Sequence, residues 1–229
     1  MTSIAHLGPA GSYSELAATN YAHWLKITRN KICTLKPYRT ISKAIQAAAT
    51  GITDTAVVPI ENSIGGSVHD TLDMLWELDN LKIQNNLVIP IHHALLSQSK
   101  NLNTIKTIYS HPQALTQCQK WLETHLPDAV QVATSSTTEA LPKLSKDKTL
   151  AAVSPLWAAK LYGIPTLADP INDNPDNATR FWILGHNSNN KGSHTSLAFR
   201  LPDNAPGALL KPLQLFATQS INMSRIESR

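Results

Sequence analysis

Apolar and polar positions alternate along the chain in short runs that predict strands and helices in turn. Short apolar runs predict extended segments. These segments are 3–7, 32–38, 55–60, 81–98, 104–110, 129–134, 150–154, 164–171 and 177–185. Longer amphipathic runs between them predict helices at 12–26, 40–51, 68–79, 112–125, 136–146 and 155–163. Strands that alternate with helices favour βαβ units with parallel sheets, so the pattern predicts an α/β fold.

Local signals mark the ends of several predicted elements. Two capping boxes of the form S-x-x-E, Ser12 with Glu15 and Ser136 with Glu139, predict helix starts. Pro90 falls inside the long apolar run 81–98, where it predicts a bend or an edge strand, because proline has no amide hydrogen for a sheet ladder.

A polar stretch, GHNSNNKGS at 185–193, separates a shorter C-terminal segment from the rest. There the pattern predicts a strand at 194–203, a helix at 205–218 and a strand at 221–229. Pro212 is an awkward residue for the interior of that helix. A βαβ piece of this length is too small to bury a full core alone.

Composition narrows the function classes. Apolar residues make up 42% of the 229 residues and charged residues only 16%, which supports a packed core and argues against disorder. The net charge of +4 is diffuse and suits a small anionic substrate as well as nucleic acid. The chain lacks the interleaved aromatic and basic residues of single-strand binders, so we expect no nucleic-acid partner.

The sequence also favours a cytoplasmic protein that does not contact membranes. Its two cysteines, Cys33 and Cys118, give no disulfide framework. The N-terminal residues MTSIAHLG read as a strand rather than a signal peptide. No apolar run approaches the roughly 18 residues of a membrane-spanning helix.

No metal or nucleotide cofactor is expected. His92 and His93 are adjacent, so on a strand they face opposite sides, and no other pair has metal-ligand spacing. The GPAGSYS stretch at 8–14 lacks both the Gly-Lys-Ser/Thr ending of a P-loop and the G-x-G-x-x-G dinucleotide pattern.

Three loops offer a different kind of site. GPAGSYS at 8–14, ENSIGGS at 61–67 and SHPQ at 110–113 each follow a predicted strand and precede a predicted helix. Such loops gather at the carboxyl ends of parallel strands, where helix N-termini and hydroxyls favour anions. The glycines in them serve tight turns equally well. Together the loops favour a site for a ligand that bears carboxylates.

Polar side chains at the strand ends are candidates for chemistry. Thr179 and Arg180 stand between the turn at 173–177 and the apolar run FWIL, where a rigid scaffold can hold functional groups. Glu61 and Asn62 follow the buried run VVPI directly. An exposed loop and a solvated strand start are the alternative interpretations of these pairs.

Two glutamines, Gln113 and Gln117, are four residues apart and share a helix face. A solvated helix face is the alternative interpretation.

Taken together, four stretches resemble the motifs of the prephenate dehydratase family. They occur in the family's order, across residues 3 to 185. The four are GPAGSYS, VVPIENSIGGSV, SHPQALTQC and NATRF. No chorismate mutase segment precedes the first motif, so the resemblance is to the monofunctional form.

The resemblance implies a fold of two Rossmann-like lobes with parallel-rich sheets around a cleft, similar to periplasmic binding proteins. Residues 1–185 would form the catalytic domain. Lobe one would comprise about 1–81 and 163–185, and lobe two about 82–162.

The resemblance also implies roles for individual residues. Thr179 matches the catalytic threonine of the Thr-Arg-Phe motif. Arg180 would hold a carboxylate of prephenate, and Phe181 would pack. The other implied substrate-binding residues are Gly11, Ser12, Asn62, Ser63, Ser110 and Gln117. The reaction takes prephenate to phenylpyruvate with loss of carbon dioxide and water, and it needs no cofactor.

The segment 194–229 resembles the beginning of an ACT regulatory domain, a partial α+β unit, and about half of that domain is expected. The family's phenylalanine-binding motifs match PGALL and IESR. The implied regulatory residues are Gly207, Ala208, Leu209, Leu210, Glu227 and Ser228. Phenylalanine would be the effector in full-length relatives, whereas a chain with half of the domain is expected to respond poorly. A homo-oligomer, a dimer or tetramer, is expected.

Two alternatives stay open. One is arogenate dehydratase, which performs the same chemistry on an amino-bearing side chain. The other is a non-catalytic, two-lobed binder of a small carboxylate.

Overall fold

The computed structural model describes residues 1–189, 192–203 and 205–227. The chain separates into two compact units, Met1–Gly192 and Ser193–Arg229. The boundary between them falls within the polar stretch 185–193.

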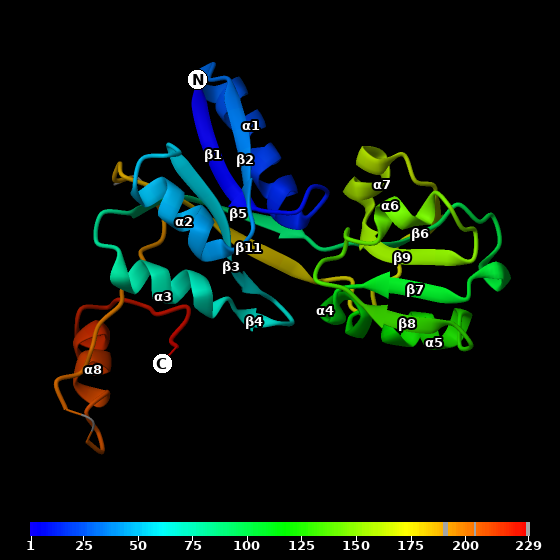
Figure 1. The fold of residues 1–229 in the computed structure, drawn as a ribbon. Coiled ribbons are helices and arrows are strands. Elements are labelled where there is room, and N and C mark those ends of the chain that lie inside the picture. Colours follow the sequence, from blue (N-terminus) through cyan, green and yellow to red (C-terminus); the bar gives the residue numbers. More distant parts are fainter. Residues whose placement is uncertain (190–191, 204, 228–229) are drawn as a thin grey trace. The chain divides into compact units, whose positions relative to one another are not determined.

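The first sheet of the larger unit is mixed in direction (Figure 1). Its strands are β1 (Thr2–Leu7), β2 (Cys33–Tyr38), β3 (Thr55–Asn62), β4 (Gly66–Ser67), β5 (Lys82–Pro90) and β11 (Ala178–Gly185). Their order is β2-β1-β3-β11-β5, and β4 pairs with β3. β1 runs parallel to β2 and β3, whereas β11 is antiparallel to β3 and β5. The strand that carries Thr179 therefore lies inside the sheet.

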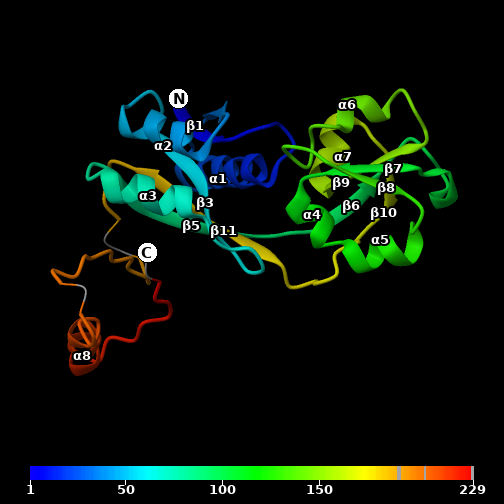
Figure 2. The ribbon, with the colours of Figure 1, turned by 60° about the horizontal axis from the view of Figure 1, so that its bottom comes forward.

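Helices cover both faces of this sheet (Figures 1 and 2). The helices are α1 (Tyr13–Arg29), α2 (Ile41–Ala49) and α3 (His69–Glu77). On one face α1 buries Tyr21 and Leu25 in the core that contains Val57. On the other face Ile45 of α2 packs in the core that contains Val58. Adjacent residues of β3 thus enter different cores, because successive side chains of a strand point to opposite faces. The sheet and its helices form lobe one.

A second sheet, in the order β10-β6-β9-β7-β8, forms the centre of lobe two. Its strands are β6 (His93–Leu96), β7 (Thr107–Ser110), β8 (Val130–Ala133), β9 (Leu150–Pro155) and β10 (Thr166–Ala168). β7 is parallel to β8 and β9, whereas β6 is antiparallel to β9 and β10. The expected α/β class with two parallel-rich sheets is confirmed.

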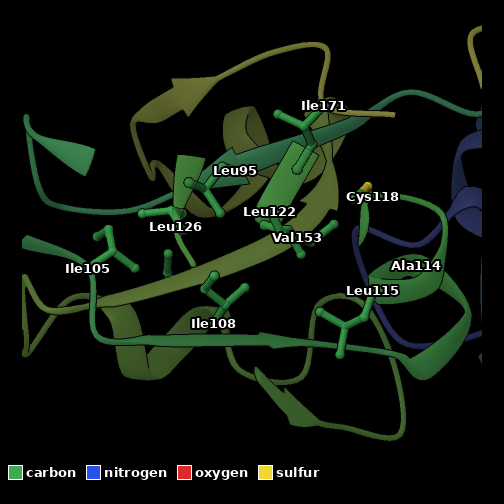
Figure 3. Close-up of a cluster of buried hydrophobic side chains, with 11 residues drawn as sticks. Leu95, Ile105, Ile108, Ala114, Leu115, Cys118, Leu122, Leu126, Val153 and Ile171 are labelled. Atoms are coloured by element: carbon green, nitrogen blue, oxygen red, sulfur yellow. The ribbon is translucent and has the colours of Figure 1, made fainter. Parts of the chain in front are cut away.

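The helical segments of lobe two are short. They are η1 (Leu102–Thr104), α4 (Pro112–Thr116), α5 (Gln119–His125), α6 (Leu141–Leu144) and α7 (Leu156–Tyr162). Figure 3 shows the core in which Leu115, Cys118 and Leu122 meet Ile108 and Val153 of the sheet. Burial raises the pKa of the Cys118 thiol to about 12, so this cysteine is a protonated core residue.

The chain changes sheet at 91–92 and at 169–177, so the expected lobe boundaries near 82 and 163 are wrong. β5 belongs to lobe one and β10 to lobe two. The apolar run 81–98 reads as one strand in the sequence, but it divides after Pro90 between two sheets. Pro90 lies on the edge strand of the first sheet, where a missing amide hydrogen breaks no ladder.

Two predicted helix starts have different outcomes. Ser12 caps α1, accepting from the Glu15 amide at 3.3 Å, but the Glu15 carboxylate accepts from the Gly11 amide at 2.7 Å. The second box is wrong, because the Glu139 carboxylate accepts from the amide and hydroxyl of Ser135 at 2.7 and 2.6 Å. This contact closes a turn, and the helix begins only at Leu141.

The smaller unit contains α8 (Leu210–Thr218). Pro212 lies in the first turn of α8, where its missing amide hydrogen costs no helical hydrogen bond. The described residues of 194–203 and 221–227 form no strand, so the strands expected there are not present. An isolated strand cannot satisfy its backbone groups without a pairing partner, and neither segment pairs with the other.

Candidate active site

A cavity of about 380 Å³ is lined by residues of both lobes. Three of the predicted site residues line it: Asn62 at the end of β3, Gln117 at the end of α4, and Thr179 at the start of β11. The sequence separates these residues by up to 117 positions, and the two sheets bring them to one place.

Thr179 and Asn62 are partners in the antiparallel ladder between β11 and β3. The Asn62 side-chain nitrogen donates to Thr179 Oγ1 at 2.9 Å. The threonine oxygen is therefore an acceptor in this contact, and its hydroxyl proton has no acceptor among the described residues. Because Thr179 lines the cavity, that proton is available to a bound ligand.

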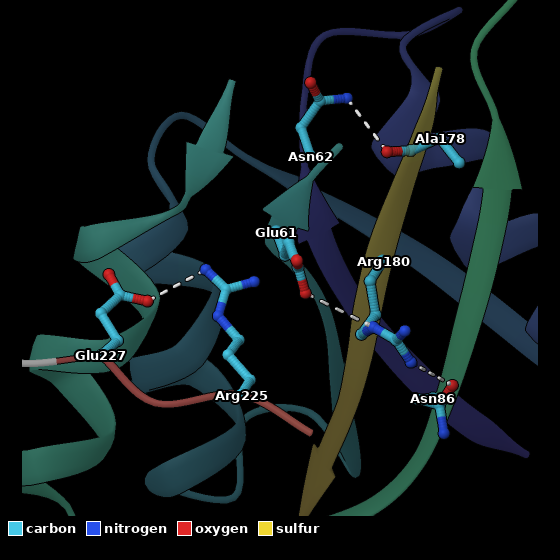
Figure 4. Close-up of polar contacts among 7 residues, drawn as sticks. All are labelled: Glu61, Asn62, Asn86, Ala178, Arg180, Arg225 and Glu227. Carbon is cyan, nitrogen blue, oxygen red and sulfur yellow. Dashed lines mark hydrogen bonds and ion pairs between the residues drawn. The ribbon is translucent and has the colours of Figure 1, made fainter. Parts of the chain in front are cut away.

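The orientation of the Asn62 amide is fixed by backbone groups. Its oxygen accepts from the amides of Ile64 and Gly65 at 3.1 and 2.7 Å. Its nitrogen also donates to the Ala178 carbonyl at 3.2 Å, a contact drawn in Figure 4. A backbone amide can only donate and a carbonyl can only accept, so the nitrogen must face Thr179.

Gln117 lies at the break between α4 and α5, where the predicted helix 112–125 is interrupted. Its side-chain oxygen is 3.0 Å from His93 Nε2 and 3.0 Å from Asn177 Nδ2. Burial lowers the pKa of His93, so the neutral ring donates through Nε2. The Gln117 side-chain nitrogen has no partner within the described chain, and this residue lines the cavity.

His111 and Gln113 bring lobe two close to the turn after β3. His111 Nδ1 accepts from the Gln113 amide at 3.3 Å and so caps α4. Because Nδ1 accepts this bond, the ring hydrogen lies on Nε2. A Cβ at Gly65 would lie 2.5 Å from Gln113 Nε2, so a larger residue there would force the Gln113 amide to move.

Tyr13 closes one side of the cavity. Its hydroxyl donates to the His92 carbonyl at 2.6 Å, and its ring meets His93 edge-on at 5.7 Å between centroids. Burial raises the Tyr13 pKa well above its ordinary value, so the phenol stays protonated. Its ring lines the cavity, and its hydroxyl holds the His92 backbone in place.

The lining of this cavity contains no aspartate, glutamate, lysine or arginine. Its polar groups are amides, hydroxyls and the imidazoles of His93 and His111. Neutral hydrogen-bond donors that converge on one cavity can bind a carboxylate and can support a departing hydroxyl.

Arg180 lies outside the lining of the cavity. Its Nε is 3.7 Å from a Glu61 carboxylate oxygen, and its Nη1 is 3.5 Å from Asn86 Oδ1 (Figure 4). Thr179 and Arg180 are neighbours on a strand, so when one faces the cavity the other faces away. The structure thus pairs Arg180 with Glu61 across the sheet.

The remaining predicted residues do not line the cavity. Ser63 accepts from the Ala178 amide at 2.9 Å, and the buried Ser110 donates to the Val153 carbonyl at 2.6 Å. Phe181 packs in the core beneath α1. Gly11 has a positive φ of 81°, which favours glycine, and Ser12 caps α1.

Sequence reasoning missed four cavity or network residues. Tyr13, His111 and Asn177 all lie inside the quoted motifs. His93 was considered only as a metal ligand. Tyr13 and His111 are adjacent to Ser12 and Ser110, and Asn177 lies two positions before Thr179, whereas His93 has no such neighbour. Only the fold shows which way these side chains point.

The described residues include no group of three histidine, cysteine, aspartate or glutamate side chains that could hold a metal. Among the described helices, none combines the length and the apolar character that crossing a membrane requires.

The predicted regulatory residues belong to the smaller unit. Gly207 has a φ of 80°, and Leu209 and Leu210 begin α8. Glu227 accepts from Arg225 at 3.0 Å, as Figure 4 shows, and Ala208 lies just before α8. Ser228 lies outside the described residues.

Comparisons with known proteins agree on one family. The family model for prephenate dehydratase matches residues 4–189. A prephenate dehydratase of Lactococcus lactis is 40% identical over 99% of this chain and 80% of that protein. The crystal structure of a prephenate dehydratase from Arthrobacter aurescens in complex with L-Phe is 33% identical, with a TM-score of 0.81. The match covers 100% of this chain and 76% of that one.

The comparisons also include a relative with a different name. Arogenate dehydratase 2 of Petunia hybrida is 37% identical over 99% of this chain and 56% of that protein. The family model covers most of the chain, and the Lactococcus protein is matched over most of its own length. The chain belongs to the prephenate dehydratase family.

Proposed function

We propose that this protein is a carbon–oxygen lyase that converts prephenate to phenylpyruvate, a step of phenylalanine biosynthesis. The observation that carries the proposal is the hydrogen bond from Asn62 to Thr179 in a cavity lined by neutral donors. This bond leaves the threonine proton for the substrate.

The reaction breaks two bonds of the substrate ring. The carbon–carbon bond to the ring carboxylate breaks and releases carbon dioxide, and its electron pair enters the ring. The carbon–oxygen bond to the ring hydroxyl breaks, and the hydroxyl leaves as water. Aromatisation drives the step, and one proton is taken up overall. A positioned donor at the departing hydroxyl contributes roughly 10²- to 10⁴-fold.

In this proposal Thr179 donates to the departing hydroxyl. The Thr179 oxygen accepts a hydrogen bond from the Asn62 side-chain amide. This bond polarises the threonine hydroxyl and makes it a better donor, because linked hydrogen bonds strengthen one another. The free Gln117 amide and the His111 imidazole would bind carboxylate oxygens. The rest of the rate enhancement would come from positioning inside the cavity.

The composition of the lining supports prephenate rather than arogenate as the substrate in this proposal. Arogenate carries an ammonium group, and a buried ammonium needs a carboxylate or several acceptors. The lining offers no carboxylate. Because one relative is an arogenate dehydratase, arogenate should also be tested as a substrate.

We assign catalysis to residues 1–185 and regulation to residues 194–229, through an ACT-like segment in a homo-oligomer. L-Phe is bound in the Arthrobacter structure, which supports phenylalanine as the effector. A saturable change of activity on phenylalanine titration would support this assignment, and no response at millimolar effector would contradict it for this chain.

The test of the proposed activity is direct. Purified protein is treated with chelator and mixed with prephenate, and phenylpyruvate is measured by its ultraviolet absorbance. We expect turnover without added metal, and a kcat/KM for prephenate at least tenfold above that for arogenate. No phenylpyruvate with either substrate would leave the non-catalytic binder as the better account.

A further inference from the structure

A chain of side-chain hydrogen bonds joins the two lobes through Asn177, a residue without an assigned role. Asn177 is only 1% exposed. Its side-chain oxygen accepts from the Asn62 amide at 2.9 Å and from the Ser63 hydroxyl at 3.2 Å. Its side-chain nitrogen donates to Gln117 in lobe two at 3.0 Å. Three side chains of two lobes therefore depend on one amide.

The direction of every bond in this chain follows from backbone groups. The Ile64 and Gly65 amides fix the Asn62 oxygen, so the Asn62 nitrogen must face Asn177. The Asn177 oxygen must then accept, and its nitrogen must face Gln117. The Gln117 oxygen is thereby occupied, and its nitrogen remains for the cavity. Amide orientations are usually assigned by such networks, and this one has a single consistent solution.

This series of hydrogen bonds determines which two donors face the cavity. At one end, the Asn62 nitrogen occupies the Thr179 oxygen and leaves the threonine proton free. At the other end, Asn177 and His93 occupy the Gln117 oxygen and leave its amide hydrogens free. If Asn177 could only accept, Gln117 would turn over and present an acceptor to the substrate.

We propose that Asn177 is a positioning residue that sets the hydrogen-bond polarity of the active site, so that Thr179 and Gln117 both face the substrate as donors. Asn177 does not line the cavity and acts through its neighbours. The inference rests on the proposed function for its kinetic readout, and it has a second readout in ligand binding.

The variant Asn177→Asp tests this idea because it keeps the shape of the side chain. The ionised carboxylate has no proton to donate, so Gln117 must rotate to donate to it. The protonated carboxyl has one hydrogen and can restore the original pattern. Burial raises the pKa of such a carboxyl above the ordinary value of about 3.9. The variant should therefore regain activity as the pH falls.

The experiment measures kcat/KM for prephenate from pH 8.5 to 5.5, with the uncatalysed rate subtracted at each pH. For Asn177→Asp we expect at least a tenfold loss at pH 8.5 and a rise toward acid that the unsubstituted protein lacks. Asn172→Asp is the matched control, because the Asn172 side chain bonds the backbone of His93 and Ile91 rather than Asn62 or Gln117, and it too lies outside the lining of the cavity. Asn172→Asp adds a carboxylate to the same segment, 169–177, where the chain passes between the lobes. Its kcat/KM should not rise as the pH falls.

Calorimetry with phenylpyruvate gives the second readout. Its affinity for Asn177→Asp should be weakened at pH 8.5 and recovered at pH 5.5. Thermal unfolding at each pH establishes that the protein is folded. If Asn177→Asp does not fold, Asn177→Ser should still weaken phenylpyruvate binding about tenfold.

Equal acid limbs in both aspartate variants, or unchanged binding in the folded Asn177 variants, would overturn the proposal. Failure of the unsubstituted protein to turn over prephenate would instead count against the proposed function.

Discussion

The side-chain nitrogen of Asn62 lies 2.9 Å from Thr179 Oγ1, between paired residues of adjacent strands. A threonine hydroxyl is a poor acid in water, and this contact gives it a defined role as a donor. The position of the hydroxyl is set by the ladder itself, because both residues belong to regular strands.

Removing the hydroxyl should remove most of the chemistry. Thr179→Ala is expected to lower kcat by about 10²-fold or more, because the departing hydroxyl loses its donor. Thr179→Ser keeps the hydroxyl and should retain measurable turnover. Steady-state kinetics with prephenate measure both variants. Near-normal kcat in the alanine variant would exclude Thr179 as the donor.

Asn62→Asp separates the donor role of Asn62 from its role in the turn. The aspartate can still accept from the amides of Ile64 and Gly65, but it cannot donate to Thr179. We expect kcat to fall at least tenfold, with some loss of melting temperature because the Asn177 oxygen and the Ala178 carbonyl lose the same donor. A large loss of thermal stability without a kinetic effect would show that Asn62 serves only the turn.

Gly65→Ala tests the approach of the two lobes at the cavity. The added methyl would lie 2.5 Å from Gln113 Nε2, so the glutamine must move and KM should rise several-fold. In the background of Gln113→Ala the same change should have a smaller effect, since the crowded atom is gone. Additive effects in this double-mutant cycle would contradict a direct contact.

Buried histidines should make stability depend on pH. Burial lowers the pKa of His6 and His93 in the folded protein, whereas the unfolded chain binds protons near the ordinary value of about 6.5. The unfolded state then binds more protons, so the free energy of unfolding is full above pH 6.5 and decreases as the pH falls below it.

Denaturant titrations at pH 7.5 and 5.5 measure this loss. His6→Gln should reduce the pH dependence, by at most about 1.4 kcal/mol per pH unit for one proton. His23→Gln, at an exposed position of α1, is the control and should leave the pH dependence unchanged. Equal pH dependence in the three proteins would show that His6 does not contribute.

The sequence predicts the elements of the larger unit well because their apolar periodicity is strong. It fails where tertiary context decides. In the run 81–98, Pro90 predicts a bend or an edge strand, but nothing in the run shows that its two parts join different sheets. The turn closed by Ser135 and Glu139 uses the same residue types as a helix cap. The strands expected in 194–203 and 221–227 have suitable patterns, but a strand exists only where a partner supplies its hydrogen bonds.

The site shows the same division. Motifs identify Asn62, Gln117 and Thr179, which all line the cavity. They do not reveal that Arg180 pairs with Glu61, or that Asn177 links the lobes. Those facts depend on side-chain direction and strand register, and a change of one position in the register would reverse them.

The position of β11 has a consequence for how the protein folds during its synthesis. β11 is the last strand of lobe one along the chain, yet it is inserted between β3 and β5, which are not neighbours without it. When synthesis has reached the end of β5, the first sheet still lacks β11, so lobe one cannot be complete at that stage however long synthesis pauses. Lobe two is synthesised in the interval. The segment that brings Thr179 also completes the first sheet, so catalytic competence and a finished fold arrive in a single event of synthesis.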